Sequence, residues 1–258
     1  MSVLKVFITG ASSGIGQALA QHYAKQGAII GLIARRADLL DSLQHSLATQ
    51  TAVYALDVRD ADALEKAAHE FIARFGVPDI VIANAGVSAG TLTENKDDIH
   101  TFKAVMDINL LGMVHTFQPF INAMKQAGKG SLVGIASVAG IRGLPGAGAY
   151  SASKAAAIAY LESLRVELSL SGINVTTIAP GYIKTPMTDI NQYPMPFLMA
   201  PDLAAKKFAR AIENKKRFVV IPWQMGVLAR LMRFLPAFLW DYMMKHAPRK
   251  AHANWDWL

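Results

Sequence analysis

The chain has 258 residues, of which 52% are hydrophobic and 17% are charged, so it can bury a sizeable core and is not a disordered chain. It contains no cysteine, which excludes disulfides, thiolate catalysis and cysteine-bound zinc. Its formal net charge of +7 favours an anionic partner.

Apolar, β-branched runs alternate with helical patterns along the chain. Predicted strands cover residues 3–9, 28–34, 52–57, 80–83, 131–137, 174–179 and 218–221. Predicted helices cover residues 14–26, 39–48, 61–75, 99–126, 150–169 and 203–214. This alternation predicts an α/β fold: a Rossmann-type doubly wound parallel sheet of about seven strands with helices on both faces, followed by C-terminal amphipathic helices.

No linker, repeat or low-complexity block interrupts the first 222 residues. We therefore expect one domain over residues 1–222 and an amphipathic, basic, Trp-rich extension over residues 223–258. Pro194, Pro196 and Pro201 break up the segment after Thr185, which predicts a mobile loop. No signal peptide is visible, and no uncharged apolar stretch reaches the ~18–20 residues of a spanning helix, so we expect a cytoplasmic protein.

A glycine-rich turn follows the first predicted strand and opens the first predicted helix. It reads Thr9-Gly10-Ala11-Ser12-Ser13-Gly14-Ile15-Gly16. Small residues let the backbone approach a pyrophosphate, and a helix N-terminus offers that group free N–H donors and a favourable dipole. The spacing departs from the usual G-x-G-x-x-G, and a purely structural turn is the alternative. Its place at the end of the first strand favours a dinucleotide site.

Arg35 and Arg36 end the second predicted strand. An NAD site usually carries an acidic residue here for the ribose 2′-hydroxyl, whereas arginine suits a 2′-phosphate. Asp38 lies three residues beyond Arg35 and is a candidate cap for the next helix. The alternative is a solvated arginine pair at a helix start, which the helix dipole disfavours. We therefore expect NADP(H) rather than NAD.

Two further groups of candidates follow the third and fourth strands. Asp57 and Val58 are placed to face an adenine ring, although an N-cap role for Asp57 is equally open. Asn84-Ala85-Gly86 suits a tight turn at the carboxyl edge of the sheet, where ligands of open α/β sheets bind.

Tyr150 and Lys154 are four residues apart and therefore share one face of a predicted helix. Tyrosine, with a pKa near ~10, is a poor acid–base catalyst at neutral pH, but a nearby ammonium lowers that pKa. Ser137 ends the fifth strand, where its hydroxyl could bind a substrate oxygen. Asn109 lies inside the 99–126 helix and could bend it or hold a water. Each has a structural alternative, such as a strand cap or a satisfied core amide, but together their order favours catalysis.

This set of motifs resembles the short-chain dehydrogenase/reductase family over residues 3–211. The resemblance includes Pro180-Gly181 and Thr185, which follow the sixth strand. It implies that Tyr150 donates a proton to a substrate carbonyl as hydride arrives from the nicotinamide, and that Ser137 holds the substrate oxygen. Lys154 would lower the pKa of Tyr150 and bind the ribose hydroxyls. Asn109 would anchor a water that relays protons through Lys154.

The resemblance also implies the residues that line the cofactor cleft. The Ile183 backbone and Thr185 would fix the nicotinamide carboxamide, and Asn84 would line the cleft. The full set of expected NADP(H) contacts is Gly10, Ser12, Ser13, Gly14, Ile15, Gly16, Arg35, Arg36, Asp57, Val58, Asn84, Ala85, Gly86, Tyr150, Lys154, Pro180, Gly181, Ile183 and Thr185.

Two departures from the family pattern limit what the resemblance implies. NADP-preferring relatives often carry a basic residue at the position of Ser13. The 3-oxoacyl-carrier-protein reductases usually end in a strand with Asp-Gly-Gly, where this chain reads Arg217-Phe-Val-Val-Ile-Pro-Trp223. This difference argues against a 3-oxoacyl-carrier-protein reductase. We expect a homo-oligomer, either a dimer or a tetramer. The seven histidines show no pair at ligand spacing, so we expect no catalytic metal.

The positive charge is concentrated at the C-terminal end. Residues 1–202 hold 15 Lys and Arg against 16 Asp and Glu, whereas residues 203–258 hold 11 against 3 and all four tryptophans. A helical 223–246 segment would place Gly226, Arg230, Arg233, Ala237, Asp241 and Lys245 on one face and leave the rest almost wholly apolar. Pro236 would kink it or start a second helix.

An apolar helix face with cations at its margin predicts peripheral contact with the inner membrane surface through residues 223–250. A cover over the substrate cleft or a dimer interface is the alternative, and no basic stripe with stacking aromatics points to nucleic acid. We expect an NADPH-dependent carbonyl reductase for a hydrophobic, lipid-like ketone. The alternatives are a soluble reductase or dehydrogenase of small polar alcohols and a non-catalytic NADP-binding sensor or scaffold.

Overall fold

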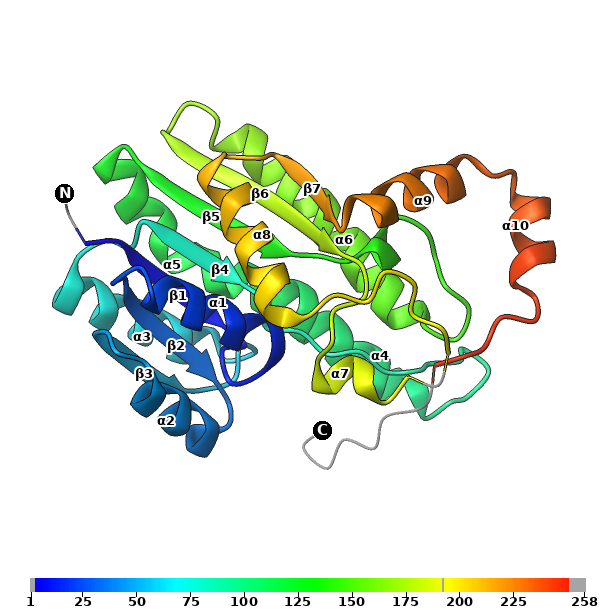
Figure 1. The fold of residues 1–258 in the computed structure, drawn as a ribbon, viewed down its shortest axis with the longest axis horizontal. Coiled ribbons are helices and arrows are strands. Elements are labelled where there is room, and N and C mark those ends of the chain that lie inside the picture. Colours follow the sequence, from blue (N-terminus) through cyan, green and yellow to red (C-terminus); the bar gives the residue numbers. More distant parts are fainter. Residues whose placement is uncertain (1–2, 192, 251–258) are drawn as a thin grey trace.

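The computed structural model of this chain describes residues 3–191 and 193–250. Among these residues, seven strands form one parallel sheet in the order β3-β2-β1-β4-β5-β6-β7 (Figure 1). The strands are β1 (Lys5–Thr9), β2 (Ile29–Ala34), β3 (Thr51–Ala55), β4 (Ile80–Ala83), β5 (Gly130–Ile135), β6 (Ile173–Pro180) and β7 (Phe218–Ile221). The predicted doubly wound α/β fold is thus confirmed, and each predicted strand corresponds to an observed one.

Helices connect the strands and continue beyond the last one. They are α1 (Gly14–Ala24), α2 (Ala37–Ser46), α3 (Ala61–Phe75), α4 (Asp98–Met106), α5 (Gly112–Ala127), α6 (Gly148–Glu167), α7 (Pro186–Asp189), α8 (Pro201–Glu213), α9 (Trp223–Phe234) and α10 (Ala237–Met244). The predicted continuous helix over residues 99–126 is wrong in one respect, because a π-helical segment, Asp107–Leu111, separates α4 from α5. Pro201 is the first residue of α8. A proline is tolerated there because a backbone N–H at this position would have no acceptor within the helix.

The sheet is covered on both faces because its strands are apolar on both sides. Successive residues of β1 point to opposite faces: Val6 and Ile8 pack with α1, α2 and α8, whereas Phe7 packs with α3, α5 and α6. The ring of Phe7 contacts three other rings, those of Tyr54, Phe71 and Phe120. Two separate cores result, one on each side of the sheet.

This topology decides where a ligand can bind. β1 pairs with β2 on one side and with β4 on the other, so the strand order reverses between β1 and β4. In open parallel sheets such a reversal leaves a crevice at the carboxyl ends of the strands. The turns that follow β1 and β4 carry the glycine-rich segment and Asn84, which therefore meet at this crevice.

The C-terminal helices leave the sheet at its β7 edge. In Figure 1, α9 and α10 extend beyond the body of the molecule, and the chain after α10 turns back toward it. The predicted 223–246 helix is divided in two, and of the two predicted effects of Pro236 the start of a second helix is confirmed, with Pro236 at the N-cap of α10. In the part of the chain that the structure describes, no helix is long and apolar enough to cross a membrane. Trp255 and Trp257, which belong to the predicted Trp-rich extension, lie outside the described residues.

Candidate active site

A cavity runs along the carboxyl ends of β1 to β6. Of the predicted site residues, all except Gly16 and Asn109 line it. This lining includes two groups of predicted residues. The first consists of the glycine turn with Arg35 and Arg36, and the second of Ser137, Tyr150 and Lys154. The topology thus brings the predicted cofactor residues and the predicted catalytic residues into one cavity.

The turn after β1 is built for close approach of a ligand to the backbone. Gly14 has a positive φ of 59°, and a Cβ there would lie 2.9 Å from the Cγ2 of Thr185. A Cβ on Gly16 would lie 2.2 Å from the Gly10 carbonyl oxygen, so Gly16 packs the helix against the turn without facing the cavity. No side chain caps the first turn of α1, and no acidic residue lies in it. The free N–H groups of this turn therefore suit a pyrophosphate.

Arg36 lies over the glycine turn. Its guanidinium donates to the hydroxyls of Ser12 and Ser13, at 3.0 and 3.1 Å. Arg36 is also the N-cap residue of α2, and Asp38 lies inside the first turn, so the candidate capping role of Asp38 is wrong. A cation held beside a pyrophosphate-binding turn is well placed for a further phosphate.

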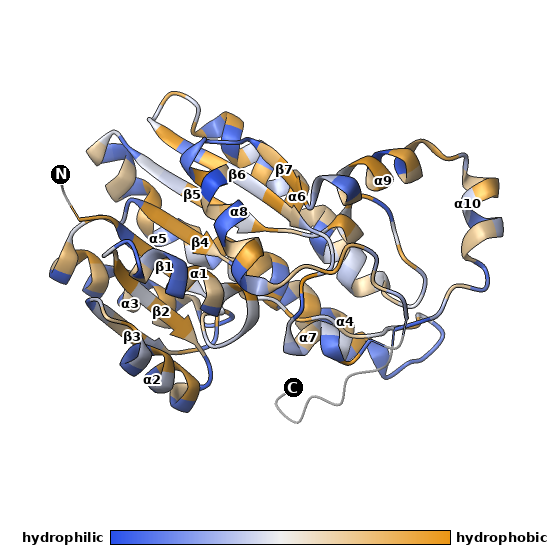
Figure 2. Cartoon of the chain, viewed as in Figure 1, coloured by the Kyte–Doolittle hydropathy of each residue, from blue (hydrophilic) through white to orange (hydrophobic). Residues whose placement is uncertain are grey.

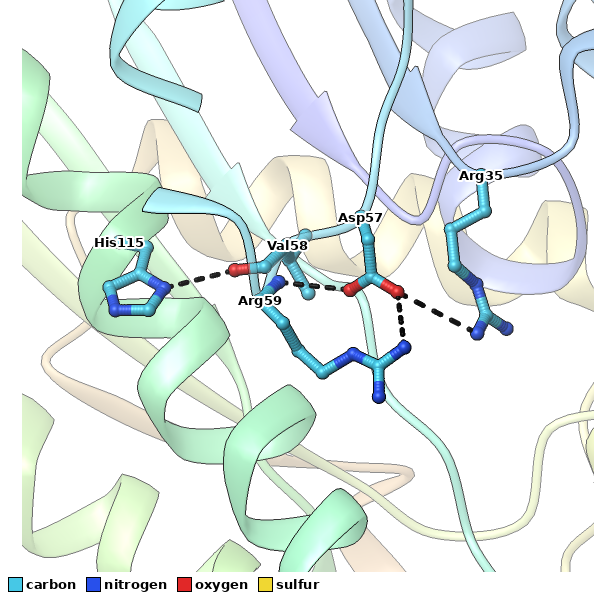
Figure 3. Close-up of polar contacts among 5 residues, drawn as sticks. All are labelled: Arg35, Asp57, Val58, Arg59 and His115. Carbon is cyan, nitrogen blue, oxygen red and sulfur yellow. Dashed lines mark hydrogen bonds and ion pairs between the residues drawn. The ribbon is translucent and has the colours of Figure 1, made fainter. Parts of the chain in front are cut away.

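Asp57 belongs to a small charged cluster at the end of β3 (Figure 3). It accepts hydrogen bonds from the backbone N–H and the guanidinium of Arg59, at 2.9 and 2.8 Å, and lies 3.9 Å from a nitrogen of Arg35. Burial alone would raise the pKa of Asp57, but the hydrogen bonds and charges of the two arginines leave it lowered. The helix-cap alternative is wrong, because Asp60 caps α3 by accepting from the Ala63 N–H at 2.9 Å.

Asn84 ties the turn after β4 to the turn after β1. Its side-chain amide donates to the carbonyl oxygens of Thr9 and Gly10, at 3.0 and 3.2 Å. The Thr9 hydroxyl in turn accepts from the backbone N–H of Asn84 at 3.2 Å. These bonds lock the two sides of the crevice together, so Asn84 shapes the cavity as well as lining it.

Tyr150 and Lys154 lie one turn apart on α6 and face the end of β5, where Ser137 follows. Lys154 is 4% exposed, its ammonium donates to the Ile135 carbonyl at 2.9 Å, and it lies 5.9 Å from the centroid of the Tyr150 ring. Ser137 accepts from the Ala139 N–H at 3.1 Å, so it caps the short 3₁₀ turn Val138–Gly140. Its hydroxyl also hydrogen-bonds with Tyr150.

Burial controls the titration of this pair. It raises the pKa of Tyr150, and the hydrogen bond with Ser137 lowers it only in part. It also lowers the pKa of Lys154 to about 8. The predicted lowering of the Tyr150 pKa by Lys154 is therefore not the net direction in this structure, because desolvation outweighs the neighbouring groups. A phenol with a raised pKa stays protonated at neutral pH and therefore holds a proton to donate, but it is a weaker acid than free tyrosine.

Asn109 lies in the π-helical segment behind the cavity wall and is fully buried. Its side-chain oxygen accepts from the Val87 N–H at 2.8 Å, and its amide donates to the Val87 carbonyl at 3.0 Å and the Ser153 hydroxyl at 2.9 Å. The amide is thus satisfied by protein groups at the point where the helix departs from α geometry. Gly86 separates it from Lys154, since a Cβ there would lie 3.1 Å from the amide oxygen of Asn109 and 3.4 Å from the ammonium.

The segment after β6 closes another side of the cavity. Thr188 accepts from the Thr185 N–H at 2.9 Å and donates to the Ile183 carbonyl at 2.7 Å. Ile183 also bridges to Met199 on the far side of the predicted mobile loop. These bonds give Ile183 and Thr185 fixed positions, and sequence reasoning missed Thr188, although a Thr-x-x-Thr spacing at a helix start is a capping signal.

Two residues distant in sequence lie near Tyr150 and were also missed. The ammonium of Lys250 lies 5.9 Å from the centroid of the Tyr150 ring, and burial lowers its pKa to about 8. Burial also raises the pKa of Tyr193 to about 12, with smaller effects from Tyr182 and Tyr150. No local sequence pattern predicts either residue, because the C-terminal segment with Lys250 and the loop with Tyr193 reach the site only through the tertiary fold.

Comparison with known proteins agrees with this geometry. The model of the short chain dehydrogenase family matches residues 4–193. An uncharacterized oxidoreductase of Myxococcus xanthus (strain DK1622) is 37% identical over 244 residues, which are 93% of this chain and 96% of that protein. The 11-beta-hydroxysteroid dehydrogenase-like 2 of Arabidopsis thaliana is 33% identical over 250 residues, covering 93% of this chain and 80% of that protein.

Solved structures show the same fold. A short-chain dehydrogenase from Streptomyces avermitilis superposes with a TM-score of 0.80 at 24% identity, over 96% of this chain and 100% of that one. The alcohol dehydrogenase of the archaeon Thermococcus sibiricus, complexed with 5-hydroxy-NADP, superposes with a TM-score of 0.76 at 27% identity, over 85% of this chain and 96% of that one.

A doubly wound sheet with a dinucleotide crevice and a Ser–Tyr–Lys set at its carboxyl edge defines an oxidoreductase of alcohols and carbonyls that binds a nicotinamide cofactor. The chain belongs to the short-chain dehydrogenase family.

Proposed function

We propose that this chain is an NADPH-dependent carbonyl reductase that transfers hydride between the nicotinamide and a ketone or secondary alcohol, with a hydrophobic, lipid-like ketone as substrate. The observation that carries the proposal is the single cavity lined by the glycine turn, Ser137, Tyr150 and Lys154. A protein that only bound the cofactor would have no need of a buried acid and ammonium at the end of that cavity.

The preference for NADPH rests on the charge at the end of β2. Arg35 and Arg36 line the cavity beside the turn that suits the pyrophosphate, and Arg36 is held there by Ser12 and Ser13. The Thermococcus sibiricus relative, whose structure holds 5-hydroxy-NADP, supports the same choice. A guanidinium offers paired donors to the 2′-phosphate, which NAD lacks.

Each residue of the reaction centre has one task in this proposal. When bound, the cofactor supplies the hydride. Ser137 holds the substrate oxygen, and the neutral phenol of Tyr150 donates its proton to that oxygen. Lys154 would hold the ribose hydroxyls, and Ile183 with Thr185 would hold the carboxamide. Asn109 keeps the helix behind Lys154 in place through its bonds to Val87 and Ser153, which already occupy its side-chain amide.

The substrate side of the site favours an apolar ketone. Ile183 and Met187 line the cavity after β6. The ring of Tyr193, which is near Tyr150, lies 6.3 Å from that of Tyr182. Relatives that cover most of this chain are named as hydroxysteroid dehydrogenase-like proteins, which supports a hydrophobic substrate. An apolar side chain such as Met187 at the cavity wall favours a hydrophobic ketone over a small polar alcohol.

The experiment that tests this function replaces the acid and leaves its surroundings intact. We expect Tyr150→Phe to reduce ketone-dependent NADPH oxidation by at least about 10²-fold, because the phenol proton is lost. NADPH binding, measured by fluorescence titration, should remain unchanged. Tyr160→Phe, a change in the same helix α6 but outside the cavity lining, is the matched control and should keep full activity.

Three outcomes would contradict the proposal. Full activity in Tyr150→Phe would exclude Tyr150 as the acid. Turnover of short polar ketones in preference to long-chain ketones, in a screen of both, would favour the reductase of small alcohols. No turnover of any ketone or alcohol, with tight NADPH binding retained, would favour a non-catalytic binding role.

A further inference from the structure

The exposed apolar residues of this protein are concentrated in α9 and α10. Nineteen large hydrophobic residues are exposed in the part of the chain that the structure describes, and nine of them lie between residues 223 and 243. Figure 2 shows hydrophobic residues along both helices, which extend outward from the β7 edge of the sheet. The nine residues are Trp223, Val227, Leu228, Leu231, Phe234, Phe238, Leu239, Tyr242 and Met243.

Helix α9 turns its apolar face outward. Its buried residues are Met225, Gly226 and Ala229, and a Cβ on Gly226 would lie only 3.1 Å from Val220 of β7. Trp223, Val227, Leu231 and Phe234 recur every three or four residues on the opposite side and are 69%, 45%, 63% and 85% exposed. The close-packed, glycine-containing side contacts the sheet, and the large apolar side chains contact solvent.

The orientation is held by Arg142, from the loop that follows Ser137. Its guanidinium donates to the Met232 carbonyl and, at 2.8 Å, to the Leu235 carbonyl, which lie at the end of α9. The same guanidinium lies 4.6 Å from the centroid of the Trp240 ring, the one buried residue of α10. The outward apolar face is therefore built into the fold by specific bonds at both helices.

The charged residues of these two helices are mostly basic. Residues 223–246 carry three cations, Arg230, Arg233 and Lys245, against one acidic residue, Asp241. All three cations are exposed. A second copy of the chain docked on this face would bring two like-charged surfaces together, which costs free energy. An anionic surface is complementary.

We propose that the apolar face of α9 and α10 docks on an anionic lipid bilayer, with its aromatic and aliphatic side chains in the headgroup region and its cations against the lipid phosphates. The contact is peripheral. It concerns a surface separate from the cavity and does not depend on the proposed reductase activity.

The test uses the full chain and vesicles of defined composition. We expect the wild type to co-sediment with phosphatidylcholine vesicles that contain phosphatidylglycerol, and to bind pure phosphatidylcholine vesicles far more weakly. Binding should weaken as salt is added. Phe234→Ser with Phe238→Ser should reduce the binding constant at least about tenfold, because two exposed aromatic anchors are lost. Ile99→Ser with Leu170→Ser, a pair 62% and 100% exposed elsewhere on the chain, is the matched control and should bind like the wild type.

A second pair of variants separates charge from apolar contact. Arg230→Gln and Lys245→Gln should each reduce binding to the anionic vesicles about fivefold and leave binding to neutral vesicles unchanged. Thermal melting of every variant shows whether it is folded, and ketone turnover in solution should equal that of the wild type. Absence of wild-type binding to anionic vesicles would overturn the proposal. So would a dimer in sedimentation velocity that the Phe234 and Phe238 changes convert to a monomer, because the face would then be a contact between copies.

Discussion

At the scale of single residues, the burial of Lys154, which suits its proposed role in the site, lowers the stability of the fold. Its side chain is almost fully buried on α6, with the Ile135 carbonyl as its hydrogen-bond acceptor. Burial of an ammonium disfavours its charged form, and the pKa falls from 10.5 to about 8. A residue that would hold the cofactor ribose therefore costs the folded state free energy at neutral pH.

The cost of burying Lys154 predicts a pH-dependent difference in stability. Between pH 8 and 10.5 the unfolded chain binds more protons at this position than the folded chain, so folding becomes more favourable as pH rises. From neutral pH to pH 10.5, the wild type should gain about 3 kcal/mol in unfolding free energy relative to Lys154→Met. Urea unfolding of both proteins measures this gain, with the exposed Lys207→Met as control. A constant difference between wild type and variant over this range would contradict the shifted pKa.

Arg35 and Arg36 are predicted to determine the preference for NADPH over NADH. Replacing either by alanine should weaken NADPH binding about tenfold or more, because charge-assisted bonds to the 2′-phosphate are lost. NADH binding should stay within about twofold of the wild type on the same physical ground. Isothermal titration with both cofactors measures the ratio, and Arg74→Ala, on the surface of α3, is the control. If the ratio of the two affinities is unchanged in both variants, the 2′-phosphate binds elsewhere.

At the scale of secondary structure, two departures from regular helices position the site. The π-helical segment between α4 and α5 directs the Asn109 amide to the backbone of Val87, and Val87 in turn lines the cavity. The 3₁₀ turn after β5 is capped by Ser137, so the hydroxyl proposed to hold the substrate oxygen also starts the loop that carries Arg142. The reaction centre and the C-terminal helices are thus connected by five residues of chain.

Arg142 links these elements, and its removal should release α9 and α10. Arg142→Ala loses the bonds to the carbonyls of Met232 and Leu235 and the stacking on Trp240. We expect limited trypsin digestion after Arg230 and Arg233 to become about tenfold faster, because local opening costs less free energy. Arg142→Lys should restore only part of the protection, since an ammonium lacks the planar fork. Unchanged digestion in Arg142→Ala would show that other contacts hold the two helices.

At the scale of the whole molecule, the protein is polarised in charge and in packing. The near-neutral sheet domain has two well-packed cores, and the basic C-terminal helices expose their apolar side chains. α9 nevertheless belongs partly to the domain, because Met225 packs on Gly181 and Gly226 packs on Val220. The end of the domain at residue 222 therefore remains a prediction that truncation can test.

Two shortened chains make that test. A chain ending at residue 222 loses the buried Met225 and should be less stable than a chain ending at residue 236 by about 2–5 kcal/mol. The longer of the two keeps α9 and its bonds to Arg142. Urea unfolding followed by circular dichroism measures the difference. Equal stabilities would show that residue 222 is the true boundary and that α9 contributes nothing to the domain.

Much of the fold and the cavity could be predicted from local patterns. Strand–helix alternation predicted the parallel sheet, and a parallel sheet brings every strand's carboxyl end to one edge. Residues placed at those ends, such as Gly14, Asn84 and Ser137, had to meet there. The spacing of Tyr150 and Lys154 depends only on the helical repeat. These features follow from periodicity, which neighbouring residues determine.

The sequence by itself thus determined the order of elements, the location of the cavity and most of the residues that line it. Only the tertiary structure decided how those groups titrate, because the raised pKa of Tyr150 depends on burial by distant segments. It also decided that α9 packs its small residues inward and its apolar residues outward, since that choice depends on β7 and Arg142. Lys250 reaches Tyr150 for the same reason: the contact joins residues 100 positions apart, beyond any local pattern.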